Sequence, residues 1–397
     1  MVEWKKIEDF GSYFGGLTGK TKDDFVDGNA KFITYMNVFA NPSLDISSTG
    51  VVKINEGEKQ NKIQFGDILF TGSSETPDEA GMSCVVANEL DEDYYMNSFC
   101  FGIRLDNPKQ YNLHYLKHVL RSNDVRKKIS KSASGVTRFN ISKARFGKIQ
   151  IPIPSIEEQN RIVGILDTFT ASIDNLKEQI AQRRKQYEYY RDQLLDLEGK
   201  EGVEMKSCGE VCEVTDYVAN GSFATLRENV SYRQEPDYAV LVRTIDLSNN
   251  FDGDKVYIDE RAYKFLSKSS LFGGEIIINN IGAGVGQTFR CPYLKEKMSL
   301  GPNSILVRTP NNDFYYYWFN SIYGQNAMMK VVTPGAMPKF NKTGFKTITV
   351  PVPPLSEQQR IVDILDKFEA SIQNLEAQLS QREKQYEYYR NKLLTFE

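Results

Sequence analysis

The chain has 397 residues, with 49 basic and 52 acidic side chains and 40% apolar residues, a composition typical of a soluble protein of two to three domains. It contains no apolar stretch of the ~18 residues that a membrane helix needs, and Met-Val-Glu-Trp is no secretory leader, so we expect an intracellular protein. The net charge of -3 disfavours binding of nucleic acid by bulk positive charge but permits local basic patches. Five cysteines without C-x-x-C spacing favour reduced thiols over disulfides or a zinc site.

The first globular segment, residues 1–151, combines strand-like runs with helical patterns. β-Branched and aromatic residues predict strands at 62–65, 67–70 and 98–104. Apolar residues at helical spacing predict helix within 111–130. Strands that precede helices in this way are typical of an α+β domain.

Two histidines, His114 and His118, fall four residues apart in this helical region. This spacing places both on one helix face. A zinc site needs at least a third ligand, and a zinc hydrolase motif also needs a glutamate beside the histidines. Neither is evident in the sequence, so we predict no metal site.

Residues 121–150 carry a strong excess of positive charge, with nine Lys or Arg and one acid, Asp124. Such a run is usually a solvated face. Here, however, the cations surround a loop with a glycine, an aromatic residue and an asparagine, so cations that neutralise phosphates lie beside an amide that reads base edges. The residues predicted to contact DNA are Thr137, Arg138, Phe139, Asn140, Lys143 and Arg145.

A long helix is predicted within the next region, residues 152–198. Pro152 and Pro154 prevent helix upstream. Apolar side chains then recur at alternating spacings of four and three, which is the seam of a coiled coil. The predicted seam consists of Ile162, Leu166, Phe169, Ile173, Leu176, Ile180, Arg183, Tyr187, Tyr190 and Leu194.

The second globular segment, residues 199–350, has the same order of features. Strand-like runs occupy 238–243, 275–278 and 304–308, and a helical pattern occupies 313–330. A glycine-rich run at 281–287 follows a strand, as nucleotide-binding loops do, but such a loop must open a helix. Because Thr-Phe-Arg-Cys-Pro follows instead, we predict a β-turn and no bound cofactor.

A second basic loop closes this segment. Residues 321–350 contain four lysines and no acid, around a Pro-Lys-Phe-Asn sequence that resembles Thr137–Asn140. The predicted DNA contacts are Lys339, Phe340, Asn341, Lys342 and Lys346. We also expect base-reading groups from the loops 71–74 and 279–282, whose small residues allow close approach of the backbone.

The final region, 351–397, repeats the first helical region. Residues 350–394 match 151–195 at 28 of 45 positions, without a gap and at an offset of 199 residues, so the chain consists of two half-length units. The second seam consists of Ile361, Leu365, Phe368, Ile372, Leu375, Leu379, Arg382, Tyr386, Tyr389 and Leu393.

The two helices are expected to pair with each other in opposite directions. The first seam would span roughly 50 Å at ~1.5 Å per residue, whereas a 150-residue domain has a radius of gyration of only about 15 Å. The second globular segment joins the end of the first helix to the start of the second, so those ends must lie near each other. We therefore predict an α+β protein with two globular domains, an antiparallel coiled coil and pseudo-twofold symmetry.

Arginine breaks each seam at the same position, Arg183 and Arg382. We expect these arginines to set the register by reaching glutamates at the seam edge, or alternatively to bind another subunit.

Catalytic motifs are not evident. The sequence has no P-loop, no Asn-Pro-Pro-aromatic or Asp-Pro-Pro-aromatic motif of amino-methylating enzymes, and only two histidines to act as general bases. We predict a non-catalytic chain.

The order of globular segment, long helix, globular segment and long helix resembles the DNA-specificity subunits of type I restriction-modification systems. The resemblance covers the whole chain and rests on the sequences IPIPSIEEQ at 151–159 and VPVPPLSEQ at 350–358, each followed by Arg-Ile-Val and Ile-Leu-Asp. It implies that each globular segment is a target-recognition domain for one half of a split, asymmetric DNA sequence.

The resemblance also implies the partners and the location. The helices would act as a spacer and as the docking site of two modification subunits, which carry S-adenosylmethionine and methylate adenine. Two restriction subunits, using ATP and Mg²⁺, would add translocation and cleavage, and the setting would be the prokaryotic cytoplasm. This chain itself would bind no cofactor.

Two alternatives belong to other classes of protein. One is a coiled-coil scaffold whose globular domains bind proteins or glycans, which the duplicated basic loop disfavours. The other is a solitary methyltransferase with attached recognition domains, which the missing catalytic motifs disfavour. Retention on duplex DNA and methylation by the purified chain, respectively, discriminate these alternatives.

Overall fold

The computed structural model describes residues 2–396, so Met1 and Glu397, the outermost residues of the predicted domains, lie outside it. The chain forms two compact units. The first contains the residues up to Lys177 and those from Ala377 onward, and the second contains Glu178–Glu376. This division passes through both long helices, whereas the predicted domains gave each helix a region of its own. Within residues 2–396, no helix is both long and apolar enough to cross a bilayer.

The globular part of the first unit contains a four-stranded antiparallel sheet and a three-stranded mixed sheet. The first has the order β2-β9-β5-β7, with strands Gly11–Gly15, Cys100–Leu105, Ile68–Thr71 and Ser83–Val85. The second has the order β4-β3-β8, with strands Thr49–Val52, Ala30–Ile33 and Tyr94–Met96. β1 (Glu3–Lys6) pairs with β12 (Gln150–Ile153), next to the long helix. The smaller helices are α1 (Tyr35–Ala40), α2 (Leu113–Val119), α3 (Asn123–Ser132) and α4 (Lys143–Gly147).

The second unit repeats this topology. Its antiparallel sheet has the order β14-β21-β18-β19, with strands Glu213–Asp216, Ser304–Arg308, Ile276–Asn279 and Thr288–Arg290. Its mixed sheet has the order β16-β15-β20-β17, with strands Tyr257–Ile258, Ala239–Val242, Lys297–Leu300 and Ser270–Leu271. β13 (Glu204–Ser207) pairs with β22 (Thr349–Val352). The smaller helices are α6 (Cys208–Val211), α7 (Phe223–Asn229), α8 (Thr244–Ser248), α9 (Glu260–Phe265), α10 (Asn312–Asn320), α11 (Ile322–Met329) and α12 (Lys342–Lys346).

Most predicted elements of the globular segments are present. β5, β9, β15, β18 and β21 occupy the predicted strand runs, and each predicted helical stretch is a pair of short helices, α2 with α3 and α10 with α11. The strand predicted at 62–65 is wrong. The buried Ile63 donates its amide to the carbonyl of Tyr94 at 2.8 Å without forming a ladder, so the apolar pattern there reflects burial of a loop.

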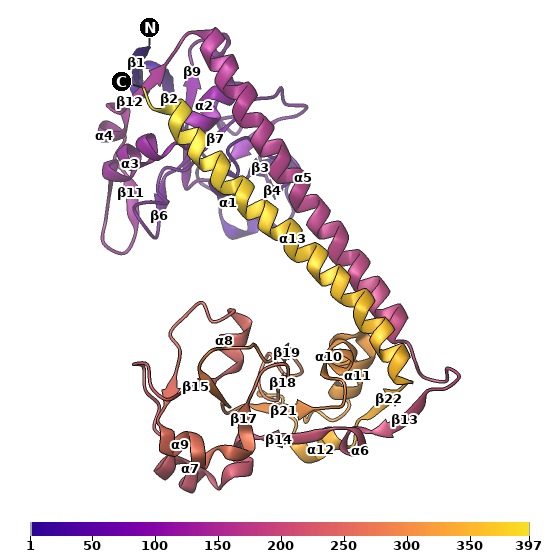
Figure 1. Cartoon of the computed structure of the whole chain (residues 1–397). Coiled ribbons are helices and arrows are strands. Elements are labelled where there is room, and N and C mark those ends of the chain that lie inside the picture. The colour runs from indigo at the N-terminus through magenta and orange to yellow at the C-terminus, as the bar shows by residue number, and fades with distance from the viewer. Residues whose placement is uncertain (1, 397) are drawn as a thin grey trace. The chain divides into compact units, whose positions relative to one another are not determined.

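The two long helices, α5 (Ile156–Leu195) and α13 (Leu355–Leu394), have 40 residues each. Within each unit they lie side by side and run in opposite directions (Figure 1). In the first unit Phe169 stacks on Tyr389 at 5.3 Å between ring centroids, and in the second unit Tyr190 stacks on Phe368 at 5.6 Å. The two pairs are related by the 199-residue offset, so the antiparallel coiled coil uses the same contact twice.

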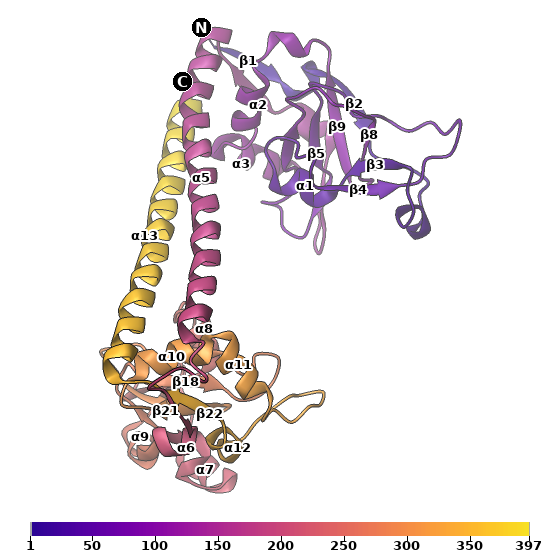
Figure 2. The same cartoon turned by 90° about the vertical axis from the view of Figure 1, so that its right-hand side faces the viewer.

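The predicted seam is mostly removed from solvent. Its side chains are buried or half-buried except Tyr190 and Tyr389, which are 46% and 40% exposed and each cover a phenylalanine ring of the other helix. The outer turns of each helix pack on a globular core, as Leu166 and Leu365 show by being fully buried (Figure 2). Burial of the seam is the hydrophobic contribution that stabilises the helix pair.

Within residues 2–396, Arg183 and Arg382 form no ion pair with a glutamate. Their guanidinium groups lie over the rings of Phe368 and Phe169, at 5.9 and 5.7 Å from the centroids. Neighbouring positions provide the interhelical ion pairs, of which Arg184 with Glu376 at 2.6 Å is the shorter. The expectation of a glutamate partner was wrong because a planar guanidinium can stack on an aromatic face and remain in the seam.

Candidate nucleic-acid interface

Three distant segments of the first unit meet beside the basic loop. β11 (Phe139–Ile141) pairs with β6 (Ser73–Ser74) and with β10 (Ala133–Ser134). The amide of Ile141 donates to the carbonyl of Gly72 at 3.0 Å, and the amide of Gly72 donates to the carbonyl of Phe99 at 2.8 Å. A Cβ on Gly72 would lie only 2.8 Å from that Phe99 oxygen, so glycine permits this close approach.

The second unit brings the corresponding segments together. The amide of Gly282 donates to the carbonyl of Pro338 at 2.8 Å, and the amide of Phe340 donates to the carbonyl of Asn280 at 3.1 Å. Lys339 forms bridges with both Ile281 and Thr333. In both units, therefore, the predicted base-reading loop lies directly against the predicted basic loop.

A hollow lies at this junction in each unit. The first hollow has a volume of about 370 Å³, and the residues of its lining used below are Ser73, Phe99, Phe101, Asn140 and Lys143. The second hollow has a volume of about 320 Å³, and its lining includes Asp216, Phe223, Asn280, Lys339 and Asn341. Each lies where the strand pair β2 and β9, or β14 and β21, meets the basic loop, so the two hollows occupy equivalent places.

The structural register of the basic loops differs from the one that their sequences suggest. Asn140 pairs with Ser134, and Lys339 pairs with Thr333, at the 199-residue offset of the helices. Lys339 is thus the counterpart of Asn140, not of Arg138, and the apparent Arg/Lys-Phe-Asn similarity is shifted by two residues.

This shift explains why two predicted DNA contacts of the second unit serve the fold. Phe340 is 4% exposed and stacks on Phe345 at 5.7 Å, so its ring belongs to the core. The Oδ1 of Asn341 accepts the amide of Gly344 at 2.7 Å and caps α12.

The remaining predicted contacts divide by exposure. In the first unit all are exposed except Phe139, which is half-buried: Thr137, Arg138, Asn140, Lys143 and Arg145. In the second unit Lys339 and Lys346 are exposed, whereas the half-buried Lys342 is paired with Asp216 at 3.1 Å. Among the predicted contacts, the second unit therefore has fewer exposed cations than the first.

Two arginines of the first basic stretch serve the fold instead. Arg121 donates hydrogen bonds to backbone carbonyls that include those of Ser83 and Val38, and Arg126 donates to carbonyls of the 78–81 turn. Burial lowers the pKa of each to about 10. Both therefore stay charged at neutral pH while they hold the backbone, and the count of nine cations overstates the charge available to a ligand.

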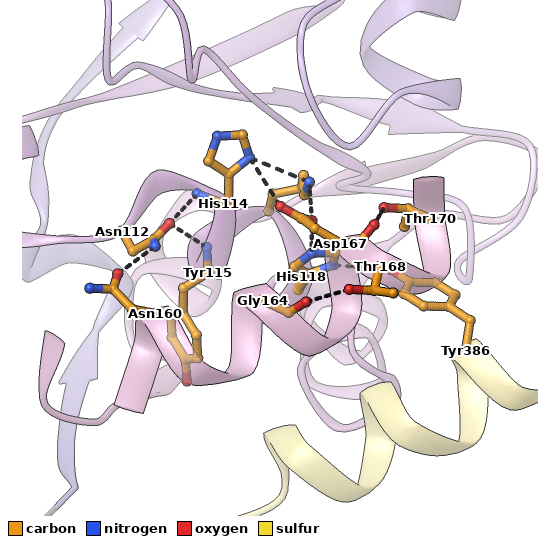
Figure 3. Close-up of polar contacts among 11 residues, drawn as sticks. Asn112, His114, Tyr115, His118, Asn160, Gly164, Asp167, Thr168, Thr170 and Tyr386 are labelled. Atoms are coloured by element: carbon orange, nitrogen blue, oxygen red, sulfur yellow. Dashed lines mark hydrogen bonds and ion pairs between the residues drawn. The ribbon is translucent and has the colours of Figure 1, made fainter. Parts of the chain in front are cut away.

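His118 ties the globular part of the first unit to both long helices (Figure 3). Its Nε2 lies 2.8 Å from Oδ1 of Asp167 on α5, and its Nδ1 lies 3.0 Å from the hydroxyl of Tyr386 on α13. A neutral imidazole that donates to the carboxylate and accepts from the hydroxyl satisfies both contacts. Burial lowers the pKa of His118, and although burial alone would raise the pKa of Asp167, hydrogen bonds from His118 and Lys117 bring it well below its usual range.

Replacement of His118 by glutamine is expected to make the free energy of unfolding less dependent on pH in mild acid. Because the folded pKa of His118 is depressed, the unfolded chain takes up more protons below about pH 6.5, so the free energy of unfolding falls as pH falls. Urea midpoints of wild type and His118→Gln between about pH 7.5 and pH 5.5 measure this slope.

His114→Gln is the matched control. The pKa of His114 is also lowered by burial, but its side chain is 43% exposed, so this variant should keep most of the slope. An equal slope in wild type and His118→Gln would contradict the prediction.

The other motifs take structural roles. The 281–287 run is the loop of the hairpin between β18 and β19, so the predicted turn is confirmed. Across residues 2–396, no group of three or more His, Cys, Asp or Glu side chains is placed to hold a metal ion. The five cysteines are buried and free.

Known proteins are similar to this chain in sequence and in fold. The model of the type I restriction modification DNA specificity domain matches residues 1–183 and 200–383. The EcoR124I/EcoR124II specificity subunit of Escherichia coli is 31% identical over 63% of this chain and 63% of its own length, so the match spans somewhat less than two thirds of that relative. The EcoKI specificity subunit of Escherichia coli K12 is 24% identical over 90% of this chain and 78% of its own.

A solved chain shows the same fold at low identity. It comes from a structure whose subject is the structural basis of complex assembly and conformational transition of the type I R-M system. It superposes with a TM-score of 0.63 at 16% identity, covering 99% of this chain and 97% of that chain. With its duplicated topology and a family match in each half, this chain belongs to the family of type I restriction modification DNA specificity domains.

Proposed function

We propose that this chain is the DNA sequence-recognition subunit of a type I restriction-modification complex, in which each globular part reads one half of a bipartite target. The observation that carries the proposal is the pair of equivalent hollows, each built from a recognition loop and a basic loop, in a member of this family. Exposed cations of the basic loops neutralise phosphates, while other polar side chains of the hollows contact base edges.

The two half-sites should differ in sequence. Asn140 of the first hollow is replaced by Lys339 in the second, and the second hollow alone contains an acid, Asp216. An amide, a lysine and a carboxylate prefer different base edges. An asymmetric target follows from these differences.

The long helices provide the spacer and the docking surfaces for two modification subunits. Tyr189 and Tyr388, at equivalent positions, are each 59% exposed, so each helix offers an aromatic anchor of the kind that interfaces favour. The modification subunits would carry S-adenosylmethionine, and restriction subunits, where present, would use ATP and Mg²⁺. This chain would contribute recognition and no catalysis.

Co-expression with a candidate modification subunit, followed by mapping of methylated adenines, tests the proposal. We expect methylation of one bipartite, asymmetric sequence with a fixed gap, and none when the modification subunit is expressed alone. Methylation that lacks a bipartite target would contradict the function, as would methylation by the purified specificity chain without a partner.

Removal of an exposed cation from a basic loop should weaken DNA binding without a change of target. Lys143→Gln and Lys346→Gln should each lower the slope of log affinity against log salt by about one, because each phosphate contact releases about one counterion. Titrations of duplex DNA with the assembled complex at several salt concentrations measure this slope.

Lys128→Gln is the matched control from the same basic stretch. Lys128 is already paired with Asp124 at 2.6 Å, so its removal should leave the slope nearly unchanged. An unaltered slope in both Lys143→Gln and Lys346→Gln would remove these lysines from the interface.

A further inference from the structure

We propose that Arg138 and Phe99 form a base-reading unit that selects a guanine in the half-site of the first unit. This inference rests on the proposed function and deepens it. Arg138 was predicted from sequence only as a DNA contact, and Phe99 was not predicted at all. The structure brings the two together from segments that are 39 positions apart in the sequence.

Arg138 is held in place from two sides. Its guanidinium carbon lies 5.1 Å from the centroid of the Phe99 ring, and its Nε donates to Oγ of Ser73 at 3.2 Å. Ser73 is itself buried, and its carbonyl accepts the hydroxyl of Tyr35 at 2.7 Å. A stacked guanidinium with its Nε already engaged has lost much of its rotational freedom before DNA arrives.

The outer edge of the guanidinium remains available. Within residues 2–396, Arg138 has no ion pair. Arg138, Glu75 and Glu79 nevertheless line the same pocket, which is separate from the first hollow. Glu79 instead accepts hydrogen bonds from the hydroxyls of Ser74 and Thr76. The two terminal amino groups of Arg138 are therefore free to donate together.

A fixed fork of two donors matches one base in particular. In the major groove, guanine presents O6 and N7 as adjacent acceptors, which arginine contacts with two parallel hydrogen bonds. A phosphate contact also benefits from positive charge but does not require the fork to be oriented, since lysine binds phosphate as a point charge. Orientation by Phe99 and Ser73 therefore favours base reading.

Phe99 is well placed as the positioning residue. Its side chain is 55% exposed, which is unusual for a large apolar ring on an ordered turn. Its amide donates to Oδ1 of Asn97 at 2.9 Å, and its carbonyl accepts the amide of Gly72, so the turn is fixed from both sides. Stacking with Arg138 accounts for its exposure at the edge of the first hollow.

The second unit lacks this device. At the 199-residue offset, Arg138 corresponds to Met337, which is 64% exposed and carries no charge. The structure therefore assigns the arginine-based selection of guanine to one half-site only, and the other half-site serves as the comparison.

Arg138→Lys in the co-expressed complex tests the proposal, because it keeps the charge and removes the fork. We expect one G·C position of one half-site to lose its selectivity in the methylation map, while the other half-site keeps its sequence. Binding to the native target should weaken roughly 5- to 150-fold, the range for one bidentate base contact, with an unchanged salt slope. Phe99→Leu should weaken selectivity at the same position, and Phe99→Tyr should preserve it.

Arg261→Lys, at an exposed arginine on α9 of the second unit, is the matched control and should leave the methylation map unchanged. A uniform loss of methylation in Arg138→Lys, with every position equally selective, would identify a phosphate contact and overturn the proposal. So would a wild-type target without a G·C pair in either half, or an unaltered map in Phe99→Leu. Absence of any bipartite target in wild type would refute the proposed function together with the base reader, whereas the other results refute the reader alone.

Discussion

Duplication of one heptad in each long helix is expected to lengthen the gap between the two methylated half-sites by about three base pairs. Seven residues add about 10 Å of helix at ~1.5 Å per residue, and a base pair occupies about 3.4 Å. Repeating residues 174–180 in α5 and 373–379 in α13 preserves the seam period, because both segments end on equivalent seam positions, Ile180 and Leu379. Mapping of methylated adenines in the co-expressed complex measures the new gap.

The longer spacer should also bind DNA more weakly. Three base pairs turn the duplex by roughly a third of a turn at ~10.5 base pairs per turn, whereas a heptad leaves each helix facing its partner as before. The DNA must then be twisted to present both half-sites, which costs free energy.

Duplication in α5 alone is the control. It misaligns contacts such as Phe169 with Tyr389 and should abolish methylation. A doubly extended protein that methylates the original sequence would exclude the helices as the spacer.

The helices were the part of the fold that the sequence predicted best. Their seam is a local pattern repeated over 40 residues, and the repeat supplies its own partner. The hollows were predicted less well because they depend on how distant loops pair. Arg138-Phe139-Asn140 and Lys339-Phe340-Asn341 look alike as strings, yet the strand pairing places them two residues out of register, and Phe340 lies in the core.

Phe99 shows why part of the interface had no signal in the sequence. A lone phenylalanine between strand residues resembles any core residue, and only the turn at 97–100 leaves its ring exposed beside Arg138. Counting charges, in contrast, predicts too many residues for the interface. Arg121 belongs to the most basic stretch of the chain, but its donors point into the protein.

Replacement of Arg121 by alanine is therefore expected to destabilise the first unit by about 3–5 kcal/mol, the cost of breaking a buried charged network. Its Nε and Nη2 donate to the carbonyl of Ser83 at 2.8 and 2.6 Å, and Nη2 also donates to the carbonyls of Val38, Phe39 and Asn41. Without the guanidinium these carbonyls lose their partner, and α1 is no longer joined to β7. Lysine should not restore stability, because it lacks the planar fork.

Urea unfolding followed by tryptophan fluorescence measures this loss in the proper unit. The chain has two tryptophans, Trp4 in the first unit and Trp318 in the second. A Trp4→Phe background reports only the unfolding of the second unit. The transition that is seen with Trp4 present and is missing in this background therefore belongs to the first unit. Lys127→Ala, at an exposed position of the same basic stretch, is the control and should change stability by less than about 0.5 kcal/mol. If Arg121→Ala kept full stability but lowered the salt slope of DNA binding, Arg121 would be a DNA contact rather than a residue that holds the fold. The opposite pairing, lost stability in Arg121→Lys and a lowered slope in Lys143→Gln, would separate the cations that hold the fold from those that meet the duplex.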